Sequence, residues 1–318
     1  MGRPAMIPVV AAIAAALALV GLIAWALSRA HDRRIRTTRL LLLVPGLPEP
    51  LQSLRIAYAS DLHAGMLYVT REELLAAVDA ADPDLLLLGG DYAAAGRNRE
   101  EALSLLAALA VQRPTFGVPG NTEHYFRFDF GEIDEVLATG DGGLLVNEVR
   151  DIEIDGATLE LIGLDDPEKG HLDVTAALAG ASEGAAVRIA LAHSPAIWPE
   201  LGRVGAHLML CGHTHGGQIR PPGLEAPLTH MSYPARLAAG LFRHAPGQRP
   251  TMQRLAGHWW ILSHRRPISA STAPGPLMYV SRGVGVGIIP VRFLCPPELV
   301  VIELAAGRPP REATSGDE

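Results

Sequence analysis

The sequence predicts an α/β domain built on a mixed β-sheet system, and three observations support this fold class. Short apolar runs alternate with amphipathic helical patterns through most of the 318 residues. Hydrophobic residues make up 48% of the chain and charged residues 19%, which suits a sizeable core and excludes disordered, collagen-like and coiled-coil chains. The chain has 2 cysteines, which excludes a disulfide framework or a cysteine-rich zinc site.

The expected elements begin after a proline-rich stretch that ends at Pro50. A first apolar run predicts a strand, the apolar spacing of the next segment predicts an amphipathic helix, and a second strand and helix repeat this pattern. A third strand precedes a hairpin, which we expect because Gly156-Ala157 separates two strand-like runs, and further apolar runs complete the domain. Strands are predicted over 54–59, 84–88, 115–118, 151–155, 158–163, 187–192, 206–211 and 299–304, and helices over 71–81 and 99–111.

The N-terminal segment has the character of a membrane anchor. No charged residue occurs from Pro4 to Ser28, and a helix of this length spans about 30 Å of hydrocarbon. We expect one N-terminal transmembrane helix over residues 5–28; a cleaved signal peptide is the alternative, because Ala24-Trp25-Ala26 resembles a cleavage site. Several arginines follow the apolar run, so the positive-inside rule places the rest of the chain in the cytoplasm, unless these arginines merely stop transfer.

The remaining chain divides by composition into three parts. Residues 29–53 are expected to form a basic, proline-rich linker, residues 54–304 the folded domain, and residues 305–318 a polar, disordered tail. The formal net charge is −7, which differs from the basic footprint of nucleic-acid-binding proteins. We therefore expect no nucleic-acid partner.

Polar side chains with metal-binding chemistry follow most of the predicted strands. In α/β folds the loops beyond the carboxyl ends of the strands form the ligand crevice, so these side chains are expected to converge. Taken singly, each motif also fits a turn, a helix cap or a satisfied polar residue. The set consists of Asp61, His63, Asp91, Asn121, His193, His213 and His215.

Bound cations explain this set better than a metal-free cluster does. Burying four histidines and two carboxylates together carries a heavy desolvation cost, which bound cations remove. Imidazole, carboxylate and carboxamide ligands without thiolate favour two divalent ions among Mn, Fe, Zn and Co. A pair of ions needs one bridging carboxylate and open positions for water and substrate, and Asp91 is the natural candidate for the bridge.

The order and spacing of these motifs resemble the calcineurin-like metallophosphoesterase superfamily. The motifs are Asp61-x-His63, Gly90-Asp91, Gly120-Asn121, His193 and Gly212-His213-Thr214-His215. The segment 279–285, followed by Pro290-Val291-Arg292-Phe293 and Pro297-Glu298, is further similar to the membrane-anchored bacterial branch typified by YkuE-like phosphoesterases. The likeness covers residues 54–304.

The resemblance implies a four-layer α/β sandwich with two mixed β-sheets and a dinuclear metal centre. Asp61, His63 and His215 would hold the first ion, Asp91 would bridge, and Asn121, His193 and His213 would hold the second. A metal-bridging hydroxide would then attack phosphorus and hydrolyse a phosphodiester or pyrophosphate bond. The branch further implies a single-pass protein of the bacterial inner membrane.

The sequence departs from the family pattern at one position. The family has a histidine directly after the asparagine, where it helps the leaving group or the developing charge. Here that position is Thr122, and its hydroxyl cannot donate a proton near neutral pH as an imidazole can. We therefore consider three explanations: His124 reaches in as a catalytic residue, the leaving group needs little protonation, or the enzyme is slow. The alternative for His124 is a surface histidine.

The segment 221–275 is longer than a simple connection and is expected to form an insert or cap. It carries six arginines, four aromatic residues including Phe242, and the single acid Glu225. Such an insert suits anionic lipid headgroups or a lipid-linked substrate such as a UDP-acyl-sugar, although an ordinary lid is the alternative. Arg282 and Arg292 are candidates for phosphate contact or for structural ion pairs.

Three functions remain open on this evidence. The first is an anchored phosphoesterase or pyrophosphatase that acts on a lipid-linked substrate, and the second is a tethered phosphodiesterase with a soluble substrate. The third is a catalytically weak or silent metal-binding membrane protein that uses the fold for interaction. Thr122 is the observation that supports the third hypothesis.

Overall fold

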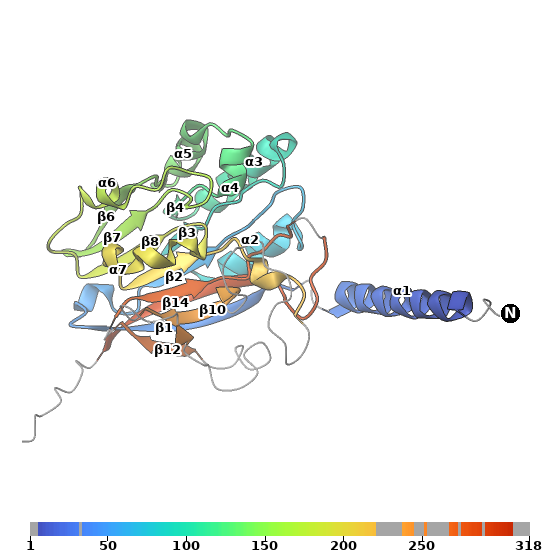
Figure 1. Ribbon diagram of the computed structural model, residues 1–318. Helices are drawn as coiled ribbons and strands as arrows, with labels where there is room; N and C mark the ends of the chain where they lie inside the picture. Colours follow the sequence, from blue (N-terminus) through green and yellow to red (C-terminus); the bar gives the residue numbers. More distant parts are fainter. Residues whose placement is uncertain are drawn as a thin grey trace, which may run out of the picture.

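Two seven-stranded β-sheets pack face to face at the centre of the molecule, and helices cover their outer faces (Figure 1). The computed structural model describes residues 6–31, 34–220, 237–244, 251–252, 267–272, 275–287 and 290–307. Within these residues the chain forms helices, sheet, sheet and helices, which are the four layers expected from the sequence. The fold prediction of an α/β protein with two mixed sheets is therefore confirmed.

The first sheet has the strand order β12-β1-β14-β2-β3-β4-β5. It is mixed, because β14 runs antiparallel to β2 whereas the remaining neighbours are parallel. Its strands are β1 (Arg36–Pro45), β2 (Arg55–Ala59), β3 (Leu85–Leu88), β4 (Thr115–Gly117), β5 (Gly143–Leu144), β12 (Ile268–Ser271) and β14 (Glu298–Gly307).

The second sheet has the order β11-β10-β13-β9-β8-β7-β6. Its central strands β13, β9, β8 and β7 are parallel, and antiparallel strands flank them on both sides. Its strands are β6 (Glu148–Ile154), β7 (Ala157–Gly163), β8 (Val187–Leu191), β9 (Leu208–Cys211), β10 (Gly240–Arg243), β11 (Thr251–Met252) and β13 (Leu277–Val280). The hairpin expected at Gly156 is the β6–β7 pair.

Helices pack against the outer face of each sheet. Against the first sheet lie α2 (Arg71–Ala81), α3 (Arg99–Ala110) and α5 (Phe130–Ala138), and against the second lie α6 (Val174–Leu178) and α7 (Leu201–Val204). The short helix α4 (Asn121–Tyr125) follows β4 directly. Helix α2 begins at a capping box in which Thr70 and Glu73 satisfy each other's backbone N–H groups, so its predicted start is fixed locally.

Alternate residues of each strand separate the two sides of the sheets. In β3, Leu85 and Leu87 face the core between the sheets, whereas Leu86 and Leu88 face the helices. This double burial explains why β3 is an uninterrupted leucine run with no polar alternation. All four side chains of β3 are buried, so the loop that follows starts from a rigid position.

The stretch 29–53 differs from the linker expected from the sequence. Residues 36–45 form β1, which pairs with β14 over its whole length and with β12 on its other side. The inward side chains Leu40, Leu42 and Val44 are buried in the core between the sheets. The linker prediction is therefore wrong for β1, because its partners lie more than 200 residues away and no local pattern reveals them.

The N-terminal helix α1 (Met6–His31) projects away from the two-sheet body (Figure 1). Its described side chains, residues 10–23, are exposed and include Val10, Ile13 and Leu17. Within the described part of the chain, no helix was found that is long and apolar enough to cross a membrane. The transmembrane helix expected over 5–28 is therefore not confirmed.

Most of the predicted insert 221–275 and of the predicted tail 305–318 lies outside the described residues. The described parts of the insert belong to the sheets rather than to a cap. Phe242 on β10 is fully buried and packs edge-to-face near Trp198, and Arg243 donates to the backbone carbonyls of Ser271 and Gly275. Phe242 is therefore part of the core, and Arg243 bonds to the neighbouring backbone. Residues 305–307 of the predicted tail extend β14.

Candidate metal centre

The candidate ligands lie in loops that follow strands of both sheets. Asp61 and His63 follow β2, Asp91 follows β3, and Asn121 follows β4 in the first sheet. In the second sheet, His193 follows β8, and His213 and His215 follow β9. The predicted convergence at the carboxyl ends of the strands therefore has a simple cause, because the two sheets face each other along this edge.

The local backbone of these loops is unusual. Five of the candidate ligands have a positive φ, namely Asp61 (53°), His63 (46°), Asp91 (55°), His213 (68°) and His215 (50°). Such conformations are uncommon for residues with a side chain, and they concentrate where function over-determines the backbone. Each loop turns sharply just after its strand, which directs the side chains back across the sheet edge.

Glycines in the motifs allow these loops to approach one another. Gly90 has a φ of +81°, and a Cβ placed on it would lie 2.6 Å from the backbone nitrogen of Gly120. A Cβ on Gly212 would lie 2.4 Å from Asp61 Oδ2. The glycine of each Gly-Asp and Gly-His motif is therefore required by the neighbouring loop.

The structure brings six of the predicted ligands into two compact groups. Asp61, His63 and His215 form the first group, and Asp91, His193 and His213 form the second, each with ligand atoms within 4.8 Å of one another. Asn121 joins the second group, because its Oδ1 lies 3.0 Å from His193 Nε2 and 2.8 Å from His213 Nδ1. All seven predicted residues therefore meet at one place.

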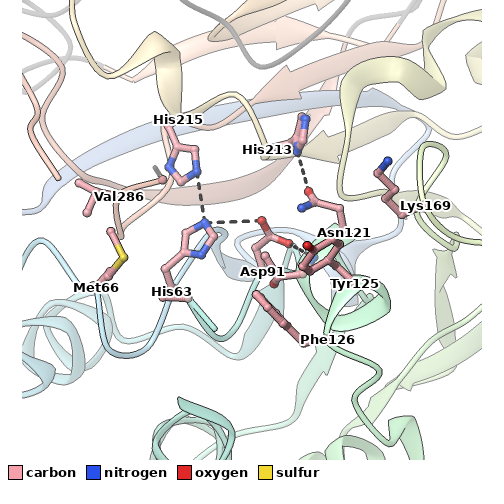
Figure 2. A pocket seen from close by; sticks show the side chains of 13 residues that line it. His63, Met66, Asp91, Asn121, Tyr125, Phe126, Lys169, His213, His215 and Val286 are labelled. Atoms are coloured by element: carbon pink, nitrogen blue, oxygen red, sulfur yellow. Dashed lines mark hydrogen bonds and ion pairs between the residues drawn. The ribbon is translucent and has the colours of Figure 1, made fainter. Parts of the chain in front are cut away.

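Asp91 lies between the two groups. Its Oδ2 is 3.5 Å from His63 Nε2 in the first group, and its Oδ1 is 3.4 Å from His193 Nε2 in the second. Figure 2 shows His63 directed toward both His215 and Asp91, with Asn121 directed toward His213. The two oxygens of one carboxylate thus serve both groups, which is the arrangement that a bridging ligand requires.

The donor and acceptor pattern of the second group calls for a cation. His193 Nδ1 lies 2.7 Å from the carbonyl of Gly89, so this nitrogen carries the proton and donates. In the neutral ring, Nε2 then carries a lone pair and can only accept. Its neighbours, Asn121 Oδ1 and Asp91 Oδ1, are also acceptors, so no proton is available between them. A metal ion accepts all of these lone pairs at once, so the residues fit the group that the family implies.

The ionisation of the buried groups supports the same conclusion. Burial alone would raise the pKa of the Asp91 carboxyl, but the imidazoles of His193 and His63 hold it well below its usual range. Burial opposes the charged form of His193, yet the Asp91 carboxylate raises the pKa of this ring well above its ordinary value. The second group therefore attracts positive charge. Burial and the neighbouring His63 lower the pKa of His215, which favours the neutral imidazole that binds metals.

Two glutamates that the sequence reasoning missed hold the second group in place. The buried carboxylate of Glu123 accepts the backbone N–H groups of Asp91, Tyr92 and Gly120, each at 2.9 Å. Glu168 Oε2 lies 3.0 Å from His213 Nε2 and accepts from the hydroxyl of Ser194 at 3.0 Å. A carboxylate on the far nitrogen of a ligand histidine fixes the ring and its tautomer.

The contacts of His124 are with Asp165 and Phe130. Its Nε2 lies 2.5 Å from Asp165 Oδ1, and its ring packs edge-to-face on Phe130. The hydrogen bond with Asp165 raises the pKa of His124. His124 is not among the described residues that line the pocket above the metal groups. The bond between His124 and Asp165 joins α4, which carries Asn121, to the loop that follows β7.

Thr122 lines the pocket where the family has histidine. Its backbone N–H donates to Asp91 Oδ1 at 2.9 Å, and its hydroxyl donates to Glu123 at 3.1 Å. Among the described lining residues, the imidazoles are those of the predicted ligands His63, His213 and His215. The pocket wall therefore offers no further imidazole within the described part of the chain.

The candidate phosphate contacts Arg282 and Arg292 are both buried structural residues. Arg282 pairs with Glu298 at 2.9 Å, and Arg292 donates to several backbone carbonyls, including those of Arg282 and Gly285. These bonds hold residues 281–285 beside Asp61, whose carbonyl accepts from the N–H of Gly285 at 2.7 Å. Arg282 therefore makes the structural ion pair left open by the sequence, and Arg292 holds backbone carbonyls instead.

A cavity of about 410 Å³ opens above the two groups. Its lining includes Met66, Tyr125, Phe126, Val286 and Lys169. Five of the predicted ligands also line it, namely His63, Asp91, Asn121, His213 and His215. Figure 2 shows Met66 and Val286 on the side of His63 and His215, with Lys169 on the opposite side near His213. The cavity is large enough for a phosphoester group with parts of both substituents.

Comparisons with known proteins agree with this geometry. Residues 54–217 match the family described as calcineurin-like phosphoesterase. Phosphodiesterase YaeI of Escherichia coli is 29% identical over 256 residues, covering 79% of this chain and 82% of that protein. The uncharacterized metallophosphoesterase YkuE of Bacillus subtilis is 24% identical over 277 residues, covering 85% of each chain.

A relative from Bos taurus is named a transmembrane protein with metallophosphoesterase domain. It is 30% identical over 261 residues, covering 76% of this chain and 55% of that protein. Each of the three relatives thus matches more than three quarters of this chain.

Proposed function

The chain belongs to the calcineurin-like phosphoesterase family, and we propose that it hydrolyses a phosphodiester or pyrophosphate bond at two divalent metal ions bound beneath the pocket. Family membership and the phosphodiesterase relative identify the chain as a metal-dependent phosphoester hydrolase. The observation that carries the proposal is Asp91, whose two carboxylate oxygens face the two groups of candidate ligands.

The proposed ligand roles follow from this arrangement. Asp61, His63 and His215 hold one ion, Asn121, His193 and His213 hold the other, and Asp91 is shared by both. When bound, the two ions supply Lewis-acid stabilisation of the negative charge on the phosphoryl oxygens. The ligand set of imidazole, carboxylate and carboxamide supports Mn, Fe or Zn as the proposed ions.

The chain's own residues keep this site rigid. Glu123 ties the Asp91 loop to the Asn121 loop, and the backbone N–H of Thr122 fixes the orientation of the Asp91 carboxylate. Such preorganisation holds the ligands in place before the substrate arrives. We propose that these bonds, rather than a residue that donates protons, are the contribution of the Thr122–Glu123 segment.

The proposed substrates have a leaving group that needs little protonation. Thr122 cannot act as a proton donor near neutral pH, and His124 is bound to Asp165. Aryl phosphodiesters and pyrophosphates satisfy this condition, since phenolates and phosphates leave as stable anions. This requirement favours a pyrophosphate bond over a simple alkyl diester.

An apolar substituent is also part of the proposal. Met66 and Val286 line one side of the pocket, and their backbones are joined by a hydrogen bond from Val286 N to Met66 O at 3.2 Å. Both residues also line a second cavity of about 500 Å³ that includes Tyr68 and Val69. We propose that the acyl chain of a lipid-linked substrate, such as a UDP-acyl-sugar, lies against Met66 and Val286 on this side of the pocket.

Attachment to the bacterial inner membrane, with the enzyme on the cytoplasmic side, completes the proposal. The uncharged run of α1, the arginines that follow it and the transmembrane relative from Bos taurus support it. Expression of the full chain in bacteria followed by carbonate extraction tests it. We expect the chain in the membrane pellet; recovery in the soluble fraction would contradict membrane attachment but not hydrolysis.

The hydrolytic activity is tested with the full chain and bis(p-nitrophenyl) phosphate. We expect hydrolysis that requires added Mn²⁺, is lost on chelation and returns when the metal is restored. His213→Ala, which removes a proposed ligand, should abolish it, whereas His171→Ala, which changes an exposed histidine, should not. Metal-loaded protein that hydrolyses neither aryl diesters nor pyrophosphate diesters would favour a silent metal-binding protein instead.

A further inference from the structure

Lys169 is the one lysine of this chain. The sequence contains 27 Lys and Arg residues in total, and the other 26 are arginines. This single lysine lines the pocket above the metal groups, near His213 and opposite Met66 and Val286 (Figure 2). Lysine carries a compact, mobile point charge, whereas arginine carries a broad planar one, so the two are not interchangeable in a confined site.

The loop that carries Lys169 is held firmly to the metal centre. Asp166 Oδ2 accepts the backbone N–H of Lys169 at 2.7 Å, and Asp165 Oδ2 accepts that of His171 at 2.7 Å. Glu168, which directly precedes Lys169, contacts His213. The position of the Lys169 backbone relative to the second metal group is therefore defined by several bonds, although its side chain is exposed at the pocket.

No carboxylate lies within ion-pair distance of Lys169 Nζ among the described residues. The neighbouring Glu168 is engaged with His213 and Ser194, and Asp91 faces His63 and His193. A cation that lines a substrate pocket without a protein counter-charge is suited to bind a negative charge on the substrate. The scissile phosphoryl group itself belongs over the metal groups, so the charge near Lys169 is a different one.

We propose that Lys169 binds a second negative charge of the substrate, carried by a phosphate adjacent to the one that is attacked. The substrate class is then a pyrophosphate diester, such as a nucleoside diphosphate ester, rather than a phosphodiester with a single charge. This inference rests on the proposed hydrolytic function and selects between the two bonds named there. Met66 and Val286, on the opposite side, receive the substituent at the other end.

Matched substrates test this assignment in the metal-loaded full chain. The p-nitrophenyl esters of thymidine 5′-monophosphate and thymidine 5′-diphosphate differ by one phosphate, and chromatography resolves their products. We expect wild type to prefer the diphosphate ester, and Lys169→Met to lose roughly five- to tenfold of that preference in kcat/KM. Lys169→Arg should retain part of it, and Arg97→Met, an exposed cation outside the pocket lining, should retain all of it.

The outcomes separate this inference from the proposed function. Hydrolysis of both esters with a ratio that Lys169→Met leaves unchanged would overturn the role of Lys169 and leave the hydrolase intact. Hydrolysis of neither ester by any variant would instead contradict the proposed function.

Chemical labelling provides a readout that does not depend on turnover. Amine-reactive reagents can modify Lys169 and the N-terminal amine, because the chain has no other lysine. We expect the non-hydrolysable methylene analogue of the diphosphate ester to slow labelling of Lys169 about fivefold, and the matching monophosphonate to protect less. Peptide mapping measures both sites, and the N-terminus serves as the internal control. Equal labelling of Lys169 with and without the analogue would contradict the proposal.

Discussion

The two groups of candidate ligands are held by different means. In the first group, bonds between backbone groups dominate: the N–H groups of Asp61 and His63 donate to the carbonyls of Gly90 and Asp91 at 3.0 and 2.9 Å, and the carbonyl of Asp61 accepts from the N–H of Gly285 at 2.7 Å. In the second group, side-chain carboxylates from neighbouring loops hold the ligands: Glu123 accepts the backbone N–H of Asp91, and Glu168 contacts His213. The first group is therefore fixed by the fold, and the second by individual side chains.

This difference means that the second group can be altered one residue at a time. A main-chain bond cannot be removed by a side-chain substitution, whereas Glu123 and Glu168 can be replaced without touching a ligand. The following changes test that distinction, beginning with the residue that both groups share.

Asp91→Asn is expected to have the largest effect. The amide replaces one carboxylate oxygen with an NH₂ group, so the side chain can no longer offer an anionic oxygen to each group. We expect kcat/KM for bis(p-nitrophenyl) phosphate to fall by about 10³-fold, and bound Mn²⁺ to fall from two ions per chain toward one. Elemental analysis alongside the assay measures both. Retention of two ions and wild-type activity would show that Asp91 does not bridge.

Glu123→Gln should have the next largest effect, and it should act on stability. Glu123 Oε2 accepts from Asp91 and Gly120, and Oε1 accepts from Tyr92. Glutamine keeps one acceptor oxygen and places an NH₂ donor at the other position, so at least one of these buried N–H groups loses its partner. We expect the free energy of unfolding of the metal-free chain to fall by about 2–3 kcal/mol, measured by urea denaturation. Glu183→Gln, at an exposed position, is the matched control. If both variants unfold alike, Glu123 does not hold the loops together.

Glu168→Gln should weaken the second group while leaving the first unchanged. The carboxylate near His213 Nε2 makes the ring a better ligand through its other nitrogen, and an amide does so less well. We expect the affinity for the more weakly bound of two Mn²⁺ ions to fall about 10- to 100-fold by calorimetric titration. Glu183→Gln again serves as the control. A loss shared equally by both ions would remove the distinction between the groups.

His124→Gln should have the smallest effect on catalysis and a pH-dependent effect on stability. The contact with Asp165 raises the pKa of His124, so its stabilising contribution is full below its unfolded pKa and is lost as pH rises through the folded pKa. The pKa of Asp165 is lowered; burial opposes this shift, but the bonds from His124 and from the backbone N–H groups of His171 and Asp166 together outweigh it. The Asp165 contribution is therefore present above its unfolded pKa and is lost only in stronger acid.

Urea denaturation at pH 5.5 and pH 9 measures this pH dependence. His124→Gln should destabilise the chain more at the lower pH, and His171→Gln, at an exposed histidine, should show no such difference. Activity should stay within about threefold of wild type, since a lost proton donor costs about 10²-fold or more. A loss of that size would return His124 to a catalytic role.

The ligands were predictable from the sequence because each of them follows an apolar strand and a tight turn. Asp61, Asp91 and His193 need no long-range knowledge to be recognised as strand-end residues, and the carboxyl ends of the strands meet at one edge. Glu123, Glu168 and Lys169 carry no such local signal, since acidic and basic residues are common in loops. Their roles depend on which loop lies beside which, and only the folded chain shows this.

Two signals in the sequence could still have revealed part of what was missed. Gly163 ends a predicted strand and Asp165 and Asp166 follow it, in the same way that Asp91 follows Gly90. The single lysine stands four residues beyond Asp165 in an arginine-rich chain. By contrast, β1 could not be found locally, because Pro45 and Pro48 give its end the character of a linker and its partners are distant in sequence.

Anomalous diffraction from crystals of the full chain grown with Mn²⁺ tests the central claim most directly. We predict two anomalous peaks about 3.5–4 Å apart, with one oxygen of Asp91 directed at each. Asp61, His63 and His215 should surround one peak, and Asn121, His193 and His213 the other. A single peak, or two peaks that Asp91 does not connect, would contradict the account of a shared dinuclear site.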